Sequence, residues 1–578
     1  MTASAGSRSG VAPDAPTVPL RTQARLAVER AWARATASGA LPPIDASATD
    51  TAPAVEIERP AKPEHGDLAT NLGLKLARPL RRPPLAIAEV LAAEIQAEIA
   101  GAGPRSTPVS SVEVAPPGFL NMRLSDAALE DVVASVVASP ASWGRVPPVR
   151  PRKVNVEFVS ANPTGPLHIG NARGAFVGDL LCRVLEAGGQ EVASEYYFND
   201  SGAQIRNLGA SVVAVWRSEP IPEDGYHGDY VRQLAIDVPE DVWAEVGRPG
   251  NDDAEIVGRW AATRVREGIE ASLERLGVHF DVWKGEGSLH EEGWVDRAVE
   301  RLREHGHVFE QDGAVWFRST ALGDDKDRVI FKSDGAPTYF AADIGYVTEK
   351  FSRGFDHLIY IWGADHHGTV ARVRNAAEAM GYDREAVQVL LYSWVRFIRD
   401  GAEISMSKRA GDFITLDDLL AEVGVDAARW FFASRAATSG IDFDIELAKK
   451  QSAENPVYYV QYAHARIASI LRKAADAGLE PAPDVRGALA GAPEAALSRA
   501  LARFPEVVED AAWAEETVGI TAFATELATT FHAFYRDARV VDPAEPERSR
   551  ARLGLSLATK VTLANALALL GISAPESM

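Results

Sequence analysis

The stretch that most constrains the fold of this chain runs from Lys153 to Gly174 and reads KVNVEFVSANPTGPLHIGNARG. Its first part, Val154 to Val159, is a β-branched and aromatic run with one charged residue, which is typical of a strand. A Gly/Pro-rich loop follows and leads into an apolar helical pattern from Ala175 to Leu185. A strand, a tight loop and a helix in this order predict the nucleotide-binding unit of an α/β sheet.

The loop carries residue types that suit a phosphate-bearing ligand. Backbone N–H groups at a helix start attract phosphate, glycine allows close approach, and an imidazole can donate to a developing pyrophosphate. His168, Gly170 and Asn171 stand at these places. The His-x-Gly pattern alone is weak evidence, because 12 His and 46 Gly predict about one chance occurrence and the chain has two, at His168 and His366. Evidence for nucleotide binding at this loop must therefore come from the surrounding sequence.

That surrounding sequence resembles a known family. The run SANPTGPLHIGNARGAFVGD, followed by YYFNDSGAQI, is similar to the signature of class I aminoacyl-tRNA synthetases, and specifically of the arginyl-tRNA synthetase family. The family's His-Ile-Gly-His element corresponds to His168, Ile169, Gly170 and Asn171. Asn171 departs from the pattern, because its amide donates hydrogen bonds but never carries a positive charge. The resemblance implies that His168, Gly170 and Asn171 bind ATP and take part in catalysis.

A second element near residue 400 completes the signature. The five residues Ser405, Met406, Ser407, Lys408 and Arg409 resemble the class I Lys-Met-Ser-Lys-Ser loop, with serine and arginine at its two ends. Nucleotidyl transfer builds negative charge on the phosphates, and a cation closing over them stabilises the transition state more than the ground state. The resemblance implies catalytic roles for Lys408 and Arg409 and ATP contacts for Met406, Ser407 and Lys408.

An arginine ligand has its own requirements. Its guanidinium is always charged and offers five donors in a plane, so a selective pocket needs carboxylates and planar acceptors. Each candidate also has a plainer interpretation: Glu157 as an exposed residue on an edge strand, Asn162 as a turn former, Tyr339 as core and Asp343 as a helix surface charge. The resemblance implies that arginine binds at Glu157, Ser160, Asn162, His168, Tyr339 and Asp343.

The run WGADHHGTVARV offers possible metal ligands in Asp365, His366 and His367. Consecutive residues rarely reach one ion together, and no second His/Cys cluster accompanies them, so we expect no protein-bound metal. The run follows a strand-like pattern, which predicts a position at the carboxyl edge of the sheet, where ligands bind. Similar synthetases place adenosine contacts in this loop, and the candidates are Gly363, Asp365 and His366.

The predicted fold class is an α/β Rossmann-type catalytic domain with an insertion, preceded by a small α+β N-terminal domain and followed by an all-α helical bundle. The predicted boundaries are a disordered tail over 1–19, an N-terminal domain over 20–125, the catalytic domain over 126–420 and a helical domain over 421–578. The resemblance implies that the domain over 20–125 contacts tRNA and that the domain over 421–578 binds the anticodon. The insertion is expected at about 217–303, a helical and acidic segment too long for a simple crossover.

The aromatic residues of the last domain are candidates for RNA contact. Tyr458, Tyr459 and Tyr462 can stack on unpaired bases, although aromatic residues at helical spacing usually form core. The net charge of −21 means that a tRNA partner requires local basic patches. The single cysteine, Cys182, excludes a disulfide within the chain and is expected to be a buried core residue.

The resemblance implies an arginine–tRNA ligase activity. L-arginine and ATP give arginyl-adenylate and pyrophosphate, and the arginyl group passes to the 3′-terminal adenosine of tRNA(Arg), with Mg²⁺ accompanying ATP. No apolar run approaches the ~20 residues that a bilayer requires, so we expect no membrane span and a cytoplasmic location. A monomer is expected from the resemblance. Two alternatives stay open, a non-catalytic RNA-binding relative of the family and a different nucleotidyl-transferring enzyme.

Overall fold

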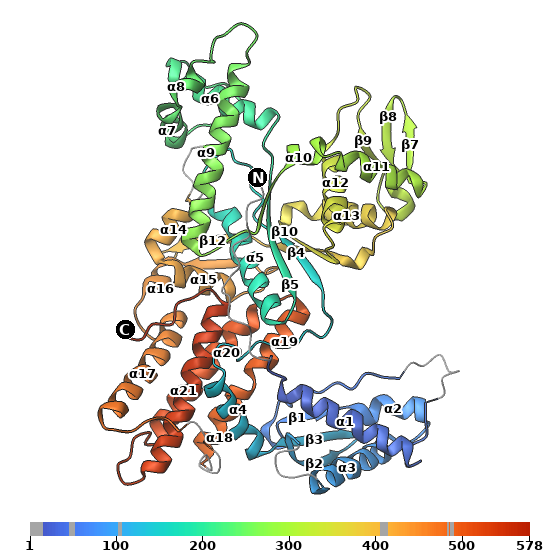
Figure 1. The fold of residues 1–578 in the computed structure, drawn as a ribbon, viewed down its shortest axis with the longest axis vertical. Helices are drawn as coiled ribbons and strands as arrows, with labels where there is room; N and C mark the ends of the chain where they lie inside the picture. The colour runs from blue at the N-terminus through green and yellow to red at the C-terminus, as the bar shows by residue number, and fades with distance from the viewer. Residues whose placement is uncertain (1–15, 45–51, 102–106, 405–413, 483–484, 486–490) are drawn as a thin grey trace.

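The computed structural model describes residues 16–44, 52–101, 107–404, 414–482, 485 and 491–578. Figure 1 shows a parallel sheet at the centre, long helices below it, a small N-terminal unit beside those helices and two lobes above. The combination of an α/β core, a preceding α+β unit and a following helical bundle confirms the predicted fold class.

The central sheet has five parallel strands in the order β11-β10-β4-β5-β6. Its middle strand β4 is the predicted one, and four of its five residues are buried, as expected for a strand covered on both faces. Helix α5 follows it and buries Cys182. The strands are β4 (Lys153–Glu157), β5 (Glu191–Phe198), β6 (Val282–Gly285), β10 (His357–Gly363) and β11 (Val387–Tyr392), and the helices beside them are α5 (Ile169–Ala187), α12 (Tyr339–Ser352) and α13 (His367–Ala379).

The strand order reverses next to β4. From β4 the chain adds β5 and β6 on one side, and it later adds β10 and β11 on the other. Ligands of open α/β sheets bind at such a switch point, outside the carboxyl ends of the strands. The ends of β4 and β10 are therefore the expected position of a site.

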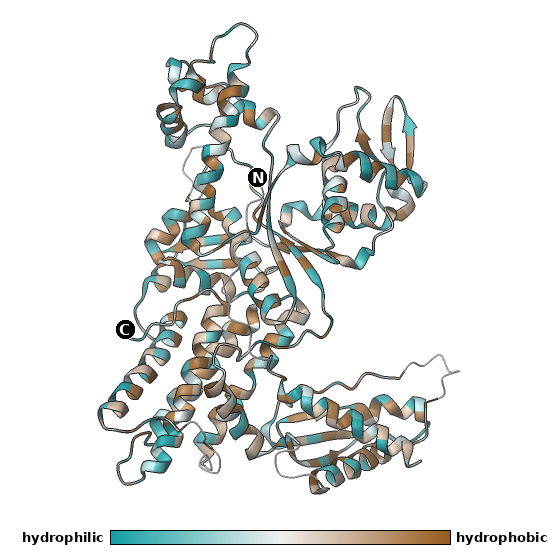
Figure 2. Ribbon diagram, viewed as in Figure 1, coloured by the Kyte–Doolittle hydropathy of each residue, from teal (hydrophilic) through white to brown (hydrophobic). Residues whose placement is uncertain are grey.

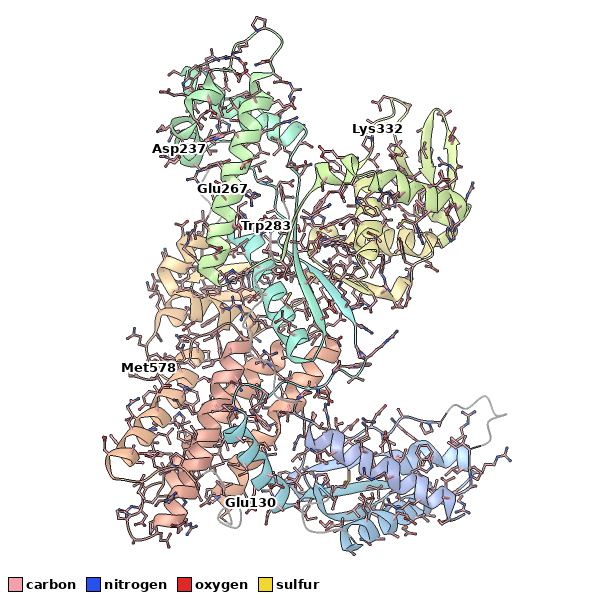
Figure 3. The ribbon with its side chains drawn as sticks, in the orientation of Figure 1. Glu130, Asp237, Glu267, Trp283, Lys332 and Met578 are labelled. Atoms are coloured by element: carbon pink, nitrogen blue, oxygen red, sulfur yellow. The ribbon has the colours of Figure 1, made fainter. Side chains whose placement is uncertain are left out.

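The range 217–303, expected as one insertion, is divided in the structure. Helices α6 to α9 form a lobe, marked by Asp237 and Glu267 in Figure 3, and the chain then returns as β6, which holds Trp283. Strand β6 pairs with β5, and a four-residue strand leaves little trace in a sequence pattern. The elements are α6 (Ala203–Arg217), α7 (Asp229–Asp237), α8 (Glu240–Trp243), α9 (Asp253–Leu276), α10 (Glu286–Glu291) and α11 (Trp294–Glu304).

A second lobe forms beside α12 and α13 from an antiparallel sheet in the order β7-β8-β9. Another small sheet, in the order β13-β12-β14, joins residues on both sides of position 420, where we expected a domain boundary. These strands are β7 (Val308–Gln311), β8 (Ala314–Phe317), β9 (Arg328–Phe331), β12 (Val395–Arg399), β13 (Ala402–Glu403) and β14 (Ile441–Asp444), and the short 3-10 helices of the chain are η1 (Pro63–His65), η2 (Ser319–Leu322), η3 (Ala364–His366) and η4 (Arg384–Ala386).

The C-terminal bundle buries apolar faces between long helices, and Figure 2 shows hydrophobic and hydrophilic residues alternating along them. Helix α4 packs on α18 and α21 of this bundle, although we expected residues from 126 onward in the catalytic domain. The helices are α4 (Asp126–Ala138), α14 (Leu416–Val423), α15 (Val425–Ala433), α16 (Ile445–Lys449), α17 (Pro456–Asp476), α18 (Ala492–Ala502), α19 (Phe504–Ala514), α20 (Val518–Asp537) and α21 (Pro546–Leu569).

The N-terminal unit packs its helices against an antiparallel sheet in the order β1-β3-β2. Its contact with the bundle is ionic, since Arg59 donates to both carboxylate oxygens of Glu506 at 2.8 and 2.9 Å and Arg499 donates to Asp67 at 2.9 Å. The elements are α1 (Leu20–Ala37), α2 (Leu72–Leu80), α3 (Pro84–Gly101), β1 (Leu68–Thr70), β2 (Val109–Ala115) and β3 (Phe119–Leu124).

The bundle is also tied to the sheet through one buried arginine. Arg429 of α15 bonds the carboxylate of Asp179 in α5 and donates to the carbonyls of Leu276 and Leu570, at 2.9 and 2.7 Å. These partners belong to α5, to the end of the helical lobe and to the end of α21. Arg429 therefore ties the bundle and the helical lobe to α5, the helix that His168 caps.

Helix α5 can approach the sheet closely because position 178 is glycine. A Cβ atom at Gly178 would lie 2.1 Å from the ring of Phe158. We expect Gly178→Ala to lower the midpoint of thermal unfolding, because overpacking a core costs about 1–3 kcal/mol or more. Gly268→Ala in α9 is the matched control, since nothing lies within 4 Å of its Cβ position. That control should leave the midpoint unchanged or raise it, and equal midpoints for the two variants would contradict the close packing.

Candidate functional site

A pocket of about 440 Å³ opens at the carboxyl ends of β4 and β10. It lies at the switch point of the sheet and is lined by the end of β4, the start of α12 and the loop after β10. The predicted residues that line it are Glu157, Ser160, Asn171, Tyr339, Asp343, Gly363, Asp365 and His366. Residues far apart in the sequence are thus brought together at one cavity.

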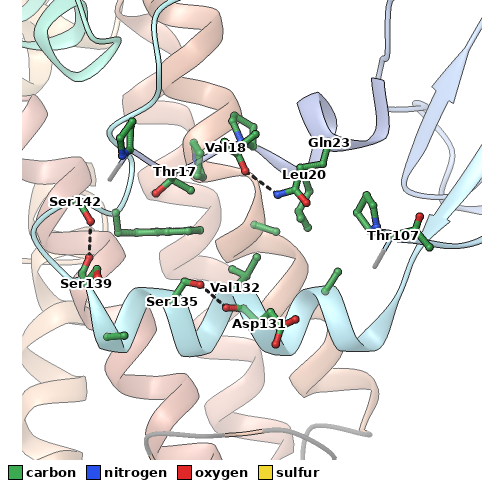
Figure 4. Close-up of a pocket in the computed structure, with 18 residues that line it drawn as sticks. Thr17, Val18, Leu20, Gln23, Thr107, Asp131, Val132, Ser135, Ser139 and Ser142 are labelled. Carbon is green, nitrogen blue, oxygen red and sulfur yellow. Dashed lines mark hydrogen bonds between the residues drawn. The ribbon is translucent and has the colours of Figure 1, made fainter. Parts of the chain in front are cut away.

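Another hollow, of about 420 Å³, lies between the start of the described chain, α4 and the bundle (Figure 4). Its hydroxyl groups are used locally, since Ser135 and Ser142 donate to main-chain carbonyls of Asp131 and Ser139. It holds none of the predicted site residues. The candidate site is therefore the pocket at the sheet edge.

The other predicted residues lie elsewhere. Asn162 is exposed, donates to Gln204 at 2.8 Å and accepts from the backbone N–H of Asn199 at 3.2 Å, so it braces the turn after β4 against the end of β5. These contacts agree with the interpretation of Asn162 as a turn residue, and its role as an arginine ligand stays a prediction. Met406, Ser407, Lys408 and Arg409 fall outside the described residues.

His168 and Gly170 form the start of α5. His168 is the N-cap, and its Nδ1 accepts from the backbone N–H of Gly170 at 2.8 Å. A nitrogen that accepts carries no proton, so in this tautomer Nε2 carries it and is a donor. A Cβ atom at Gly170 would lie 2.5 Å from the His168 ring. Glycine is therefore required for the imidazole to fold over the helix start.

The segment after the second signature is bonded to the first. The N–H of Ile169 donates to the carbonyl of Ile414 at 3.2 Å, and that of Leu416 donates to Leu167 at 2.9 Å. His168 and Thr415 form an isolated bridge between these two contacts. Residue 414, the first described residue after the predicted Lys408 and Arg409, is thus held at the N-terminus of α5.

The turn that leaves β4 is strained and braced. Val159 and Ser160 have φ of 67° and 43°, a region that β-branched residues rarely adopt. The Ser160 hydroxyl donates to Glu157 at 3.1 Å and accepts from the N–H of Tyr197 at 3.2 Å, while the Tyr196 hydroxyl bonds both N–H and carbonyl of Ala161. The neighbouring strand therefore holds Ser160 and Glu157 in place.

Asp343 lines the pocket, and Glu286 is its neighbour. Burial, assisted by Glu157 and Glu286 and opposed by Arg372, raises the pKa of Asp343 to about 7. Glu286 accepts from the Tyr197 hydroxyl at 3.0 Å, and burial together with Glu286 raises the pKa of that tyrosine. Within the described residues neither Asp343 nor Glu286 forms an ion pair. A partly buried negative site of this kind suits a cation.

The structure decides three of the plainer interpretations. Glu157 does not lie on an exposed edge, because β4 is the middle strand and the side chain is buried. Tyr339 is not a core residue, since it is 76% exposed at the rim. Asp343 is not a fully solvated surface residue, because it is partly buried in the lining of the pocket. The sequence analysis did not single out Glu286, Tyr197 or Arg372. Glu286 follows a strand that the sequence pattern does not reveal.

A separate surface of the bundle gathers aromatic and cationic side chains. His532 of α20 lies 5.2 Å from the Tyr459 ring and 6.1 Å from that of Tyr462, and the Arg466 guanidinium lies 5.6 Å from Tyr462 and 4.7 Å from Tyr535. Tyr462 and Tyr535 are partly exposed. Such a mixture suits the stacking of unpaired bases. Tyr458 makes none of these ring contacts.

No helix in the described part of the chain combines the length and apolar character that spanning a bilayer requires. The same described residues hold no group of three His, Cys, Asp or Glu side chains arranged as metal ligands. Asp365 and His366 do lie together, with their side chains 3.6 Å apart, at the open end of the pocket.

Comparison with known proteins identifies three matching family models. They are the arginyl tRNA synthetase N-terminal domain over residues 27–124, the catalytic domain of class I (R) tRNA synthetases over 248–439 and the DALR anticodon-binding domain over 460–578. Arginine–tRNA ligase 1 of Halalkalibacterium halodurans is 44% identical over 540 residues, covering 92% of this chain and 96% of that protein. The arginine–tRNA ligase of Bacillus subtilis is 43% identical, covering 91% and 95%.

Solved structures agree with these relatives. The arginyl-tRNA synthetase of Thermus thermophilus matches with a TM-score of 0.74 and 26% identity, covering 96% of this chain and all of that one. The arginyl-tRNA synthetase of Plasmodium falciparum has a TM-score of 0.72 over 98% of this chain, and at 16% identity it shows the fold alone.

Proposed function

The chain belongs to the arginyl-tRNA synthetase family, and from that membership we propose that the pocket at the sheet edge activates L-arginine with ATP. The arginyl group then passes to the 3′-terminal adenosine of tRNA(Arg), which the bundle helps to hold. The observation that carries the assignment of the pocket is Asp343, a carboxylate that lines it, has Glu286 as a neighbour and forms no ion pair with the described residues. A guanidinium group supplies the missing charge.

The arginine side chain enters between Asp343 and Glu286, and Tyr339 closes over it from the rim. Ser160 and Glu157 face the same cavity from the end of β4 and receive the amino-acid head group. Asn162 supports this turn through its bonds to Gln204 and Asn199. His168 also binds arginine, at the place where the head group of the amino acid meets the nucleotide.

ATP occupies the other end of the cavity. Its phosphates meet the N-terminus of α5, where backbone N–H groups, Asn171 and the Nε2 proton of His168 donate to them. Gly363, Asp365 and His366 contact the adenosine side. We assign Lys408 and Arg409, with Met406 and Ser407, to the phosphates from the second signature. Since the described residues offer no set of metal ligands there, Mg²⁺ is expected to enter on the ATP phosphates.

The reaction needs no covalent enzyme intermediate. An oxygen of the arginine carboxylate attacks the α-phosphorus of ATP, and the bond to pyrophosphate breaks with its electrons on the leaving group. A hydroxyl of the terminal adenosine then attacks the activated carbonyl carbon and releases AMP. The protein holds the reacting atoms in line and donates hydrogen bonds to the developing charge.

Tyr459 and Tyr462, with Arg466 and Tyr535, form the proposed tRNA surface of the bundle. Tyr458 is retained as a candidate on sequence grounds only. We further propose that the protein acts as a monomer in the cytoplasm, which rests on the family resemblance. The alternative of a non-catalytic RNA-binding relative is not favoured, because the chain carries the catalytic domain.

The decisive experiment is exchange of labelled pyrophosphate into ATP, measured with arginine, lysine and citrulline and with or without tRNA(Arg). Exchange with arginine alone among the three would support the proposed pocket. Exchange that requires tRNA(Arg) would add that the first step is coupled to the partner. Exchange with citrulline as strong as with arginine would overturn the role of the carboxylate pair, because citrulline has no charge.

The raised pKa of Asp343 predicts a pH-dependent arginine requirement. The carboxylate form binds the guanidinium, and a pKa of about 7 in the free site means that protonation competes below that pH. The arginine KM should therefore be nearly constant above pH 8 and about tenfold higher at pH 6. The ATP KM, measured at each pH, is the control. An arginine KM that stays flat from pH 8 to 6 would contradict the role of Asp343.

A further inference from the structure

Helix α12 presents one stripe of polar residues to the site, formed by Tyr339, Asp343, Tyr346 and Lys350. The first two line the pocket, and the last two lie deeper. Lys350 is fully buried, and its Nζ lies 2.6 Å from Oε2 of Glu157. Its ammonium also lies 4.3 Å and 4.1 Å from the ring centroids of Tyr346 and Tyr360.

The need for this cation arises from the sheet register. Glu157 of β4 is paired directly with Glu195 of β5, so the two side chains point to the same face. Like charges at such positions repel each other, and both carboxylates are buried. Lys350 compensates Glu157, while Arg353 donates to both oxygens of Glu195 at 2.9 and 2.7 Å.

The two contacts of Glu157 fix its carboxylate. Lys350 holds Oε2 from below, and Ser160 donates to Oε1 at 3.1 Å from the strained turn. A buried ion pair is not required for stability, because apolar residues of similar size often stabilise a protein as well. The geometry of this pair instead serves the pocket, since the carboxylate of Glu157 lines it.

We infer that Lys350 is a positioning residue for arginine binding. It acts as a resident cation that holds Glu157 in one orientation, and it leaves Asp343, which forms no ion pair with the described residues, open to a cation in the pocket. This inference rests on the proposed function, because it assumes that the pocket binds arginine. The site then contains two kinds of carboxylate, Glu157 held by Lys350 and Asp343 open to the charge of the ligand.

The test is steady-state kinetics of the full-length Lys350→Met variant, whose side chain has similar length and no charge. We expect the arginine KM to rise by about tenfold or more, because Glu157 is then buried without its partner and no longer held. The ATP KM should change by less than about twofold. Arg353→Met is the matched control, since it removes the cation of Glu195, and it should leave the arginine KM within about twofold of the wild type.

A double-variant cycle distinguishes an action through Glu157 from a general loss of structure. In a Glu157→Gln background, Lys350→Met should change the arginine KM by less than about twofold, because the partner has already been removed. Equal rises in the arginine and ATP KM values, or effects of the two substitutions that simply multiply, would overturn the inference.

If Lys350→Met does not fold, the Lys350→Arg variant tests the inference instead. Arginine keeps the charge but is larger, so it displaces Glu157 in a fully enclosed space. The arginine KM should then rise about threefold or more. An arginine KM within twofold of the wild type would then overturn the inference. A wild-type protein that does not activate arginine would instead refute the proposed function itself.

Discussion

Asp343→Asn should raise the arginine KM by about 100-fold and leave the ATP KM nearly unchanged. Asp343 is partly buried where it lines the pocket, and its pKa is raised to about 7 by burial and by the neighbouring Glu157 and Glu286. Arginine supplies that compensation, and a buried charge pair broken on one side costs about 2–5 kcal/mol. The substitution keeps the size of the side chain, so the packing of α12 should persist.

Asp365→Asn is the matched control for this prediction. Asp365 lies in the same pocket, but its side chain is 83% exposed at the end assigned to ATP. Its substitution should change the arginine KM by less than about fivefold, because an exposed charge contributes at most about 1 kcal/mol. Equal effects of the two substitutions on the arginine KM would contradict the assignment of Asp343 to the arginine end and of Asp365 to the ATP end of the pocket.

Lys408→Ala should lower the rate of adenylate formation by about 100- to 1,000-fold while the affinity for tRNA stays largely unchanged. Charge builds on the phosphates during the reaction, and removal of one group placed to stabilise it typically costs this much. The bonds of Ile414 and Leu416 to Ile169 and Leu167 support the assignment, because they hold the first described residues after the second signature at the start of α5. Single-turnover formation of arginyl-adenylate measures the effect.

Two comparisons give this prediction its controls. Arg409→Ala should have a smaller effect on the same rate, because Lys408 matches a lysine of the family motif whereas Arg409 stands where the motif has serine. Lys449→Ala removes an exposed lysine of α16 that pairs with Glu422 and Glu446, and it should have none. Normal adenylate formation by Lys408→Ala would remove the second signature from the mechanism.

Much of the architecture could be predicted because the relevant signals are local. The strand, loop and helix around His168 appear as a change from β-branched alternation to helical spacing, and the structure has β4 and α5 there. The helical bundle was visible in the same way. The range 217–303 was not, because β6 is four residues long and its place in the sheet depends on its pairing with β5.

The candidate site was predicted in part for the same reason. Residue type and family resemblance pointed to Glu157, Tyr339 and Asp343, and these three do line one pocket. Glu286 and Lys350 could not be found in that way. A glutamate after an unrecognised strand and a lysine in an amphipathic helix both look like ordinary surface charges.

The sequence by itself determined the order of the units, the strand and helix that carry the first signature, and the residue types available to an arginine pocket. Only the tertiary structure decided which carboxylates of that pocket are already neutralised. Glu157 pairs with Lys350, 193 residues away, whereas Asp343, seven residues before Lys350 on the same helix, forms no ion pair with the described residues. Charge compensation depends on distance in space and on burial, and periodicity along one element reports neither.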